Sequence, residues 1–221
     1  MKCCTSSNCR AFESVFDASY AEDDLEDYRK HGPAKATRTL LEAVQKAVPV
    51  AGATLLDIGG GVGVVHHELL RAGARSAVDV DGSSAFLAAA RREAERQGHA
   101  DRVTYVHGDF VALADEIAPA DIVTLDRVIC CYPDMPQLVG AAAMRAQRSL
   151  GLVFPCDAGW ARAGVWFINL FERLRRDPLL FYIHRTAEVD AVAGRSGLRL
   201  QFHRKVGIVW QVRVYVRSGV G

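Results

Sequence analysis

The stretch Leu55–Gly63, reading LLDIGGGVG, decides the fold, because it joins a buried strand, an acidic residue and alternating glycines in one turn. The apolar run from Ala53 to Ile58 is typical of a strand, and the sequence from Val64 onward is typical of a helix. Glycines at such a turn can adopt positive φ and let a ligand approach the backbone, while free amides at the helix start favour anionic or polar groups. The turn therefore predicts a site for a nucleotide-like molecule.

The spacing of the glycines excludes two common nucleotide sites. A dinucleotide fingerprint, G-x-G-x-x-G, needs a third glycine, but in the two possible registers that place is taken by Val64 or His66. A P-loop would end in Gly-Lys-Ser or Gly-Lys-Thr, and this loop has no lysine. What remains is Asp-x-Gly-x-Gly-x-Gly, from Asp57 to Gly63.

In this pattern the sequence resembles the class I S-adenosylmethionine-dependent methyltransferases, and the resemblance extends from about Leu41 to Tyr215. It implies S-adenosylmethionine as cofactor and S-adenosylhomocysteine as product. That cofactor has an ammonium, a sulfonium and a ribose but no phosphate, so carboxylates suit it better than a lysine. The cofactor-binding residues predicted in this first turn are Asp57, Gly59, Gly60, Gly61 and Gly63.

Further acidic residues follow the next strand-like runs. Asp81 closes the run from Ser76 about twenty residues beyond the glycine loop, the separation expected for a carboxylate on ribose hydroxyls. Capping of the helix that starts near Ser83 is the alternative. In the resembled family an acidic residue at the place of Asp109 bonds the adenine amino group, and Phe110 can pack on the adenine face.

The second half of the chain completes the expected sheet. The fourth strand is predicted at 121–125, the fifth at 150–155, and the strands at 198–206 and 209–217 alternate apolar and polar residues as an antiparallel hairpin would. Before the fifth strand, the family's usual Lys-Pro-Gly-Gly turn is replaced by Arg148-Ser149-Leu150-Gly151. The predicted fold is α/β, a Rossmann-like, doubly wound, mainly parallel seven-stranded sheet with a C-terminal antiparallel hairpin.

Residues at the end of the fourth strand are candidates for cofactor binding and catalysis. Asp126 is predicted to hold the cofactor's ammonium. The segment 126–134, DRVICCYPD, follows the strand, and ligands in open α/β sheets bind outside the carboxyl ends of the strands. Cys131 and Tyr132 are therefore the catalytic candidates, facing the transferred methyl group, although cysteine also packs as a small hydrophobe.

Composition fits one compact catalytic domain in a reducing compartment. The 221 residues carry 27 basic and 26 acidic side chains, a balance that argues against bulk nucleic-acid binding. No apolar run reaches the ~20 residues that span a bilayer, and six cysteines without an export signal predict a cytoplasmic protein with reduced thiols. We predict a methyltransferase domain at 41–221 with a helical insertion at about 157–180.

Residues 1–40 are predicted to form an N-terminal flap and helix segment. The acidic stretch 18–30 precedes a break at His31-Gly32-Pro33, and 35–48 has the pattern of a docking helix. In the resembled family such segments close over cofactor and substrate. Tyr28, Lys35 or Arg38 would then reach the methionine carboxylate, unless they are solvated surface residues.

Two other groups suggest metal sites, and neither has the required spacing. Cys3, Cys4 and Cys9 supply three sulfurs without an evident fourth ligand, so free thiols on a frayed terminus are the favoured interpretation. After His66-His67-Glu68, a zinc protease motif would need histidine where Arg71 stands. We expect the two histidines to be packing and surface residues, and no metal is predicted.

The insertion 160–176, WARAGVWFINLFERLRR, is aromatic at its start and basic at its end. Trp166, Ile168 or Leu170, and Leu174 can share one helical face, which favours core or lid packing; contact with a membrane surface is the alternative. His184 follows in an apolar run, where a histidine is usually structural unless it lines the pocket.

These observations predict methyl transfer from S-adenosylmethionine to a small molecule, apolar or planar in view of the aromatic insertion. A tetrapyrrole carboxylate is one acceptor suggested by family analogy alone. Two alternatives stay open: thiolates of Cys130, Cys131 and Cys156 assisting methylation of a soft metalloid, or a regulatory protein that binds the cofactor without transferring methyl groups. The sequence does not indicate an oligomeric state.

Overall fold

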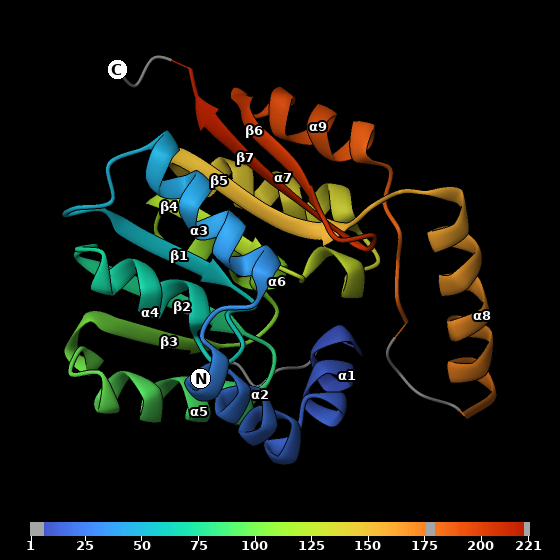
Figure 1. The fold of residues 1–221 in the computed structure, drawn as a ribbon, viewed down its shortest axis with the longest axis horizontal. Coiled ribbons are helices and arrows are strands. Elements are labelled where there is room, and N and C mark those ends of the chain that lie inside the picture. The colour runs from blue at the N-terminus through green and yellow to red at the C-terminus, as the bar shows by residue number, and fades with distance from the viewer. Residues whose placement is uncertain (1–6, 176–179, 219–221) are drawn as a thin grey trace.

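The computed structural model describes residues 7–175 and 180–218. A seven-stranded sheet runs through it in the order β3-β2-β1-β4-β5-β7-β6 (Figure 1). Strands β1 to β5 pair in parallel, whereas β7 is antiparallel to both β5 and β6. This confirms the predicted fold. The strands are β1 (Thr54–Ile58), β2 (Ser76–Asp81), β3 (Val103–His107), β4 (Ala120–Asp126), β5 (Ala146–Pro155), β6 (Leu198–Val206) and β7 (Trp210–Arg217).

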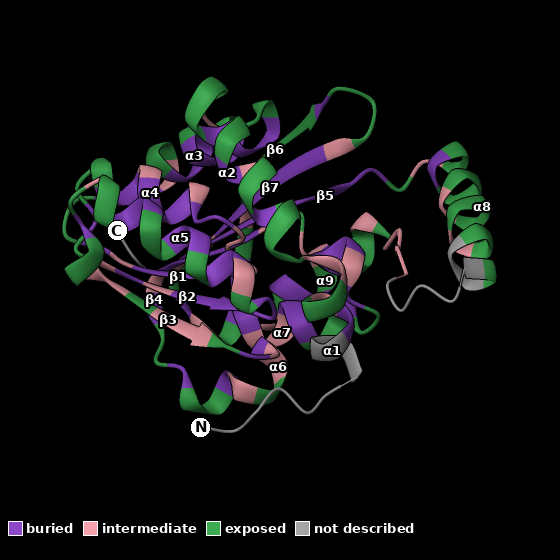
Figure 2. Ribbon diagram, turned by 90° about the horizontal axis from the view of Figure 1, so that it is seen from below, coloured by how far each residue is buried: buried purple, intermediate pink, exposed green. Residues whose placement is uncertain are grey.

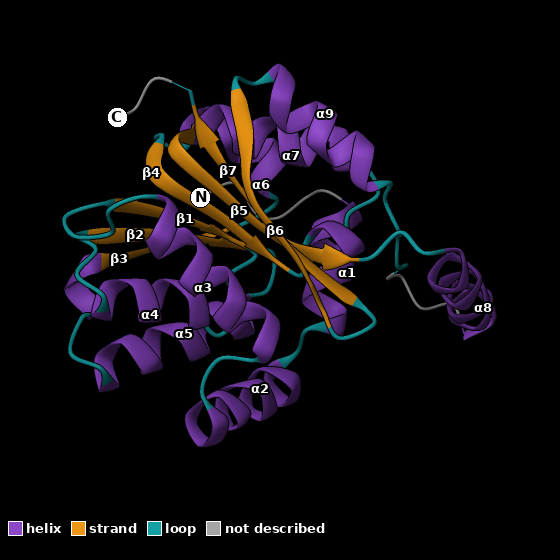
Figure 3. Cartoon of the chain, turned by 45° about the horizontal axis from the view of Figure 1, so that its top comes forward, coloured by secondary structure: helices purple, strands orange, loops and turns teal. Residues whose placement is uncertain are grey.

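Helices cover both faces of the sheet (Figure 3). One face carries α3 (Lys35–Ala47), α4 (Val64–Arg71) and α5 (Ser84–Arg96), and the other carries α6 (Phe110–Leu113), α7 (Met135–Arg145) and α9 (Thr186–Arg195). Strands buried on two faces need no polar side, and so β1 and β4 read as nearly continuous apolar runs. Two apolar cores result, one on each side of the sheet.

The fifth strand begins at Ala146, four residues earlier than predicted. Helix α7 ends at Arg145 and the chain passes directly into the strand, where Ala146 already pairs with Ala120. No separate turn exists there, so the replaced family turn lies inside β5. Gly151 serves packing instead, because a Cβ at this position would lie 2.7 Å from Cδ1 of Leu40 on α3.

Helices α1 (Ser7–Val15) and α2 (Ala18–His31) lie across the carboxyl ends of the central strands (Figure 1). The Ser83 hydroxyl donates to the Phe16 carbonyl at 2.6 Å, and the Ser84 amide donates to Glu13 at 2.9 Å. The predicted acidic flap, 18–30, is thus helical, and the segment just before it is hydrogen-bonded to the loop after β2. The predicted docking helix is α3, and the predicted boundary at residue 40 falls inside it.

Helix α8 (Gly159–Arg175), the predicted insertion, stands beside the body of the molecule (Figures 1 and 2). The expectation that Trp166, Leu170 and Leu174 face a core is wrong, because they are 61%, 44% and 74% exposed. The side of the helix nearest the protein carries the buried Ala161 and the half-buried Val165 instead. Among the described residues, no helix combines the length and apolar character needed to cross a membrane.

Candidate functional site

A cavity of about 410 Å³ opens at the carboxyl ends of β1, β2 and β4. The strand order reverses between β1 and β4, and such switch points are where open α/β sheets bind ligands. Residues of α1 and α2 close the cavity from the other side. The site therefore combines the sheet edge with the N-terminal helices.

The glycine loop forms the floor of the cavity. Gly61 has φ +58°, and a Cβ built on it would meet no protein atom within 4 Å, so its backbone faces open space. Gly59, at φ +63°, lies so close to Val128 that a Cβ would approach its Cγ2 to 2.6 Å. Gly63 caps the start of α4 and is not among the residues that line the cavity. Gly61 therefore suits contact with a ligand, and Gly59 suits close packing against Val128.

Asp81 connects two loops at the cavity wall. Its carboxylate accepts hydrogen bonds from the Gly61 amide at 3.0 Å and from the Ser83 amide at 2.8 Å. The helix that follows is capped by the side chain of Ser83, which accepts from Phe86, so Asp81 is not the N-cap residue. Burial raises the pKa of Asp81 to about 6. Each carboxylate oxygen keeps a second lone pair for a ligand hydroxyl.

Asp57 is buried beneath the same loop. One of its oxygens accepts from the Thr124 hydroxyl at 2.8 Å, and the other lies 3.0 Å from Nδ1 of His66. Both His66 and His67 are fully buried, so the expectation that they are partly surface residues is wrong. Nδ1 of His67 lies 2.8 Å from Nε2 of His99, and burial lowers the pKa of His67 to about 2. A buried polar layer, in which His67 is neutral, thus supports the loop.

Asp109 is held at the wall near β3. It caps α6 by accepting from the Val111 amide, and the Tyr132 hydroxyl donates to its Oδ1 at 3.1 Å. The buried Phe110 lines the cavity next to it. Tyr132 is 6% exposed, and its phenol is directed at Asp109. This pairing makes Tyr132 a group that positions a carboxylate.

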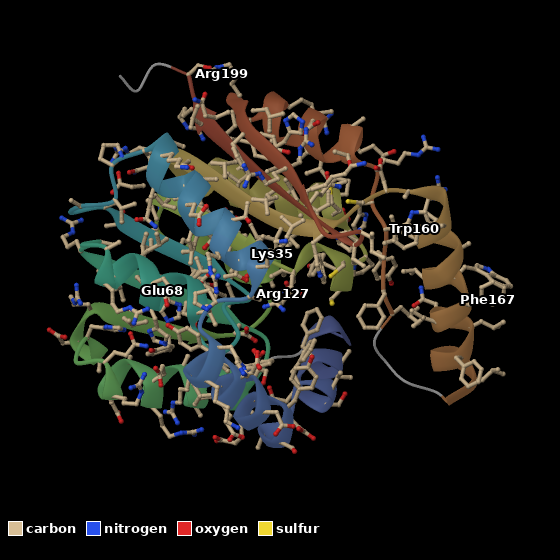
Figure 4. All side chains as sticks on the ribbon, in the orientation of Figure 1. Lys35, Glu68, Arg127, Trp160, Phe167 and Arg199 are labelled. Atoms are coloured by element: carbon tan, nitrogen blue, oxygen red, sulfur yellow. The ribbon has the colours of Figure 1, made fainter. Side chains whose placement is uncertain are left out.

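Carboxylates also gather where β4 ends. Asp126 accepts from the Thr37 hydroxyl at 2.5 Å and lies 3.4 Å from Nε of Arg127. Burial raises the pKa of Asp126 and of Asp24, while Arg127 acts in the opposite sense on both. Arg127 is the single non-glycine residue with positive φ, +64°, in the described part of the chain. It lies near Lys35, at the start of α3 (Figure 4).

The remaining wall is apolar and comes from segments far apart in the sequence. Phe12 belongs to α1 and Phe16 to the bend between α1 and α2, Phe181 to the segment before α9, and Trp210 to the start of β7. Sequence reasoning missed all four. The signal available for the first pair was the spacing of four residues, which places Phe12 and Phe16 on one helical face.

Cys130, Cys131 and Cys156, whose side chains the structure describes, do not assemble into a metal site. The sulfurs of Cys130 and Cys131 lie 3.8 Å apart at the cavity, and the hydrogen bond between them lowers the pKa of Cys131. Cys156 contacts the Trp210 carbonyl instead. No group of three or more His, Cys, Asp or Glu side chains able to hold a metal was found within 7–175 and 180–218. Cys3 and Cys4, and the side chain of Cys9, lie outside the described residues.

The structure brings nearly all predicted site residues together. The cavity is lined by Asp57, Gly59, Gly60, Gly61, Asp81, Asp109, Phe110, Asp126, Cys131 and Tyr132.

Three candidates from the N-terminal segment lie elsewhere. Tyr28 is buried against α4 and donates to Glu68 at 2.9 Å, Arg38 bonds the Pro33 carbonyl, and Lys35 lines a neighbouring smaller cavity. Tyr20 and Asp24 of the same segment line the main cavity instead. His184 is structural, because its Nε2 lies 3.0 Å from the Ile129 carbonyl.

Comparison with known proteins supports the predicted relationship. Residues 55–149 match the family model described as a methyltransferase domain. A search of curated proteins finds no match.

The fold is shared with solved methyltransferase structures. Magnesium protoporphyrin IX methyltransferase from Synechocystis PCC 6803, with bound SAH, is 19% identical over 96% of this chain and all of its own, with a TM-score of 0.72. An O-methyltransferase family protein from Burkholderia thailandensis is 18% identical over 94% of this chain and 64% of its own, with a TM-score of 0.70. An O-methyltransferase family 2 protein from Planctomyces limnophilus DSM 3776, in complex with apigenin, is 15% identical over 96% of this chain and 65% of its own, with a TM-score of 0.64. The domain match and the shared fold confirm the predicted resemblance.

Proposed function

We propose that this chain transfers a methyl group from S-adenosylmethionine to a small apolar or planar acceptor. The match of residues 55–149 to a methyltransferase domain and the class I methyltransferase fold support this proposal. One observation carries the proposal. The same cavity has carboxylates and an open glycine turn on one side and aromatic side chains on the other. A cationic nucleoside fits the first part, and an apolar molecule fits the second.

The residues present suit the cofactor. The open backbone at Gly61 admits a ligand, and the Asp81 carboxylate that fixes this loop has lone pairs for ribose hydroxyls. Phe110 offers an apolar surface for the adenine, and Asp109 beside it accepts hydrogen bonds from an amino group. Asp126, which accepts a hydrogen bond from Thr37, is the carboxylate placed to hold the ammonium.

The carboxylates also match the charge of this ligand. Burial raises the pKa values of Asp24, Asp81 and Asp126, so the ionised forms lack the solvation that water would give them. A bound cation restores part of that solvation. When bound, S-adenosylmethionine supplies a methyl group activated by its positively charged sulfur.

The chain's own contribution is alignment and exclusion of water, which suffices for this kind of transfer. Phe12 of α1 and Phe16, just after this helix, line the cavity together with Phe181 and Trp210. Cys131 lines the same cavity, with a pKa lowered by Cys130, and is placed to orient the acceptor or accept its proton.

The decisive experiment uses two measurements on the intact protein. Calorimetry with S-adenosylmethionine and S-adenosylhomocysteine should give saturable binding. Incubation with methyl-labelled cofactor and a metabolite extract should then give a labelled small molecule, which identifies the acceptor. Tight cofactor binding without any labelled product would reject catalysis, and heat with NADH or ATP but none with these two compounds would reject the proposal altogether.

A further inference from the structure

The surface of α8 is unusually apolar for an exposed helix. Of the eleven large hydrophobic side chains that are exposed in the described part of the chain, seven lie on this one helix. Figure 2 shows most of the described residues of α8 as exposed. Scattered exposed hydrophobics are ordinary, whereas a contiguous apolar surface marks a place where another molecule binds.

The apolar side chains form one stripe that faces away from the protein. Trp160, Phe167 and Leu174 are spaced seven residues apart, and Leu170 and Phe171 lie beside them on the same side of the helix. We call these five residues the outer face. Figure 4 shows Phe167 on the outer side of α8. Helix α8 is amphipathic, but its apolar stripe faces solvent instead of the protein.

A polar contact fixes this orientation. The Asn169 side chain donates to the Phe181 carbonyl at 2.7 Å and accepts from the Phe181 amide at 2.9 Å. Val165 and Ala161 lie one and two helical turns before Asn169 and are the small residues turned toward the protein. Rotating α8 to bury the outer face would break both hydrogen bonds. The outer face is therefore presented by the fold itself.

We propose that the outer face binds the outer face of a second copy of this chain, forming a symmetric dimer. The five side chains are between 44% and 74% exposed. Together with Trp166 they offer about 700 Å², taking roughly 200 Å² for each large side chain. A standard interface buries about 800 Å² on each partner. Two such helices thus provide nearly the whole area that a specific dimer needs.

The outer face is also complementary to itself. Ala163 and Gly164 interrupt the row of large side chains with a shallow step, and a Cβ built on Gly164 would meet nothing within 4 Å. Two antiparallel copies related by a two-fold axis can place a large side chain of one into the step of the other. Such reciprocal packing is how isologous interfaces and helix pairs close.

A lipid surface is the competing occupant, because the insertion carries Arg162 and ends in Arg173, Arg175 and Arg176, and a helix that lies on a membrane carries lysines and arginines along its polar face. The net charge of +1 adds no general attraction to anionic lipid, and a vesicle-binding measurement separates the two occupants.

Sedimentation of the full chain over a concentration series tests this proposal. We expect wild type to reach twice the monomer mass of 24.1 kDa. Phe167→Asp, which places a charge in the middle of the outer face, should raise the dimer dissociation constant at least about ten-fold. Ile208→Asp is the matched control, because Ile208 is 76% exposed in the turn before β7 and should leave the dimer intact.

Three results would overturn the proposal. Wild type could sediment as a monomer at every concentration, Phe167→Asp could leave dimerisation unchanged, or monomeric wild type could bind vesicles of phosphatidylcholine and phosphatidylserine. Circular dichroism and S-adenosylhomocysteine calorimetry on each variant verify that the fold is intact. Because sedimentation needs no turnover, the result is independent of the proposed activity.

Discussion

The Asp81 carboxylate accepts a hydrogen bond from the Gly61 amide at 3.0 Å, and this contact joins the glycine loop after β1 to the end of β2. The same side chain accepts from Ser83 at 2.8 Å, at the start of α5. One buried carboxylate thus fixes two loops that border the cavity. Its position depends on the loop, and the loop's position depends on it.

The first prediction concerns Gly61→Ala. A methyl group there would enter the cavity from a backbone at φ +58°, where an L-residue is strained by about 1 kcal/mol. We expect affinity for S-adenosylhomocysteine to fall at least about ten-fold, which corresponds to ~1.4 kcal/mol.

Gly98→Ala is the matched control for that substitution. Gly98 has φ +73° and also has no atom within 4 Å of a built Cβ, but it does not line the cavity. Calorimetry should show unchanged affinity and thermal melting a similar loss of stability. Equal affinities in the two variants would contradict a ligand at Gly61.

The second prediction is a pH dependence of cofactor binding. Burial raises the pKa of Asp81 to about 6, so the carboxylate that accepts ribose hydroxyls becomes protonated below that value. Binding favours the ionised form, hence affinity should be level above about pH 7 and fall below about pH 6. Calorimetry across this range measures the step. Asp81→Asn should bind more weakly with a flatter profile, and an undiminished step would assign it to another carboxylate.

The sequence could predict those parts of the site that a single turn encodes. Asp57 and Asp81 lie in the last residues of β1 and β2, and Asp109 comes two residues after β3. In a parallel sheet all such strand ends meet at one edge. The prediction that His66 is partly a surface residue is wrong, because the short loop between β1 and α4 brings its ring back to the buried Asp57. A pairing of this kind depends on where the helix packs, which residue type alone does not reveal.

The residues of the apolar wall and the orientation of α8 could not be predicted from the sequence, because both depend on tertiary structure. Phe12, Phe181 and Trp210 come to line one cavity only after three separate segments fold over the sheet edge. No local sequence pattern therefore predicts that they share a site. The periodicity of α8 correctly indicated an apolar helical face. It could not indicate the direction of that face, which is set by the hydrogen bonds of Asn169.

The third prediction separates positioning from catalysis at Tyr132. Tyr132→Phe removes the hydroxyl that donates to Asp109 at 3.1 Å but keeps the buried ring. We expect cofactor affinity to fall a few-fold, consistent with loss of a hydrogen bond worth about 1 kcal/mol, with kcat nearly unchanged. Steady-state kinetics at saturating cofactor measures this. A fall in kcat of about 10²-fold or more at unchanged affinity would make the phenol a general acid or base.

The fourth prediction concerns Asn169, which holds Phe181 at the cavity wall. Asn169→Ala removes both hydrogen bonds to Phe181, so KM for the acceptor should rise several-fold while cofactor affinity stays unchanged. Asn169→Asp keeps the oxygen that accepts from the Phe181 amide but sets its second carboxylate oxygen against the Phe181 carbonyl, so it should not restore the wild-type KM. Parallel changes in both ligands' affinities would instead indicate a general loosening of the fold.

The last prediction concerns Asp79, which is fully buried on β2 with neither oxygen in a hydrogen bond of normal geometry. Burial and the carboxylates of Asp57 and Asp81 raise its pKa well above the ordinary value, although the Gly60 amide favours the ionised form. An acid whose pKa is higher in the folded state loses stability as pH rises above its unfolded pKa. Asp79→Asn should therefore increase the free energy of unfolding by about 1 kcal/mol at neutral pH.

The size of this gain should itself depend on pH. Below about pH 4 the wild-type carboxyl is protonated in both states, so the advantage of Asp79→Asn should shrink there and grow toward pH 7. Urea unfolding at several pH values measures it, with the exposed Asp101→Asn as control for the change in net charge. A loss of stability in Asp79→Asn that grows toward pH 7 would mean that the carboxylate is needed in its ionised form, against the direction given by its burial.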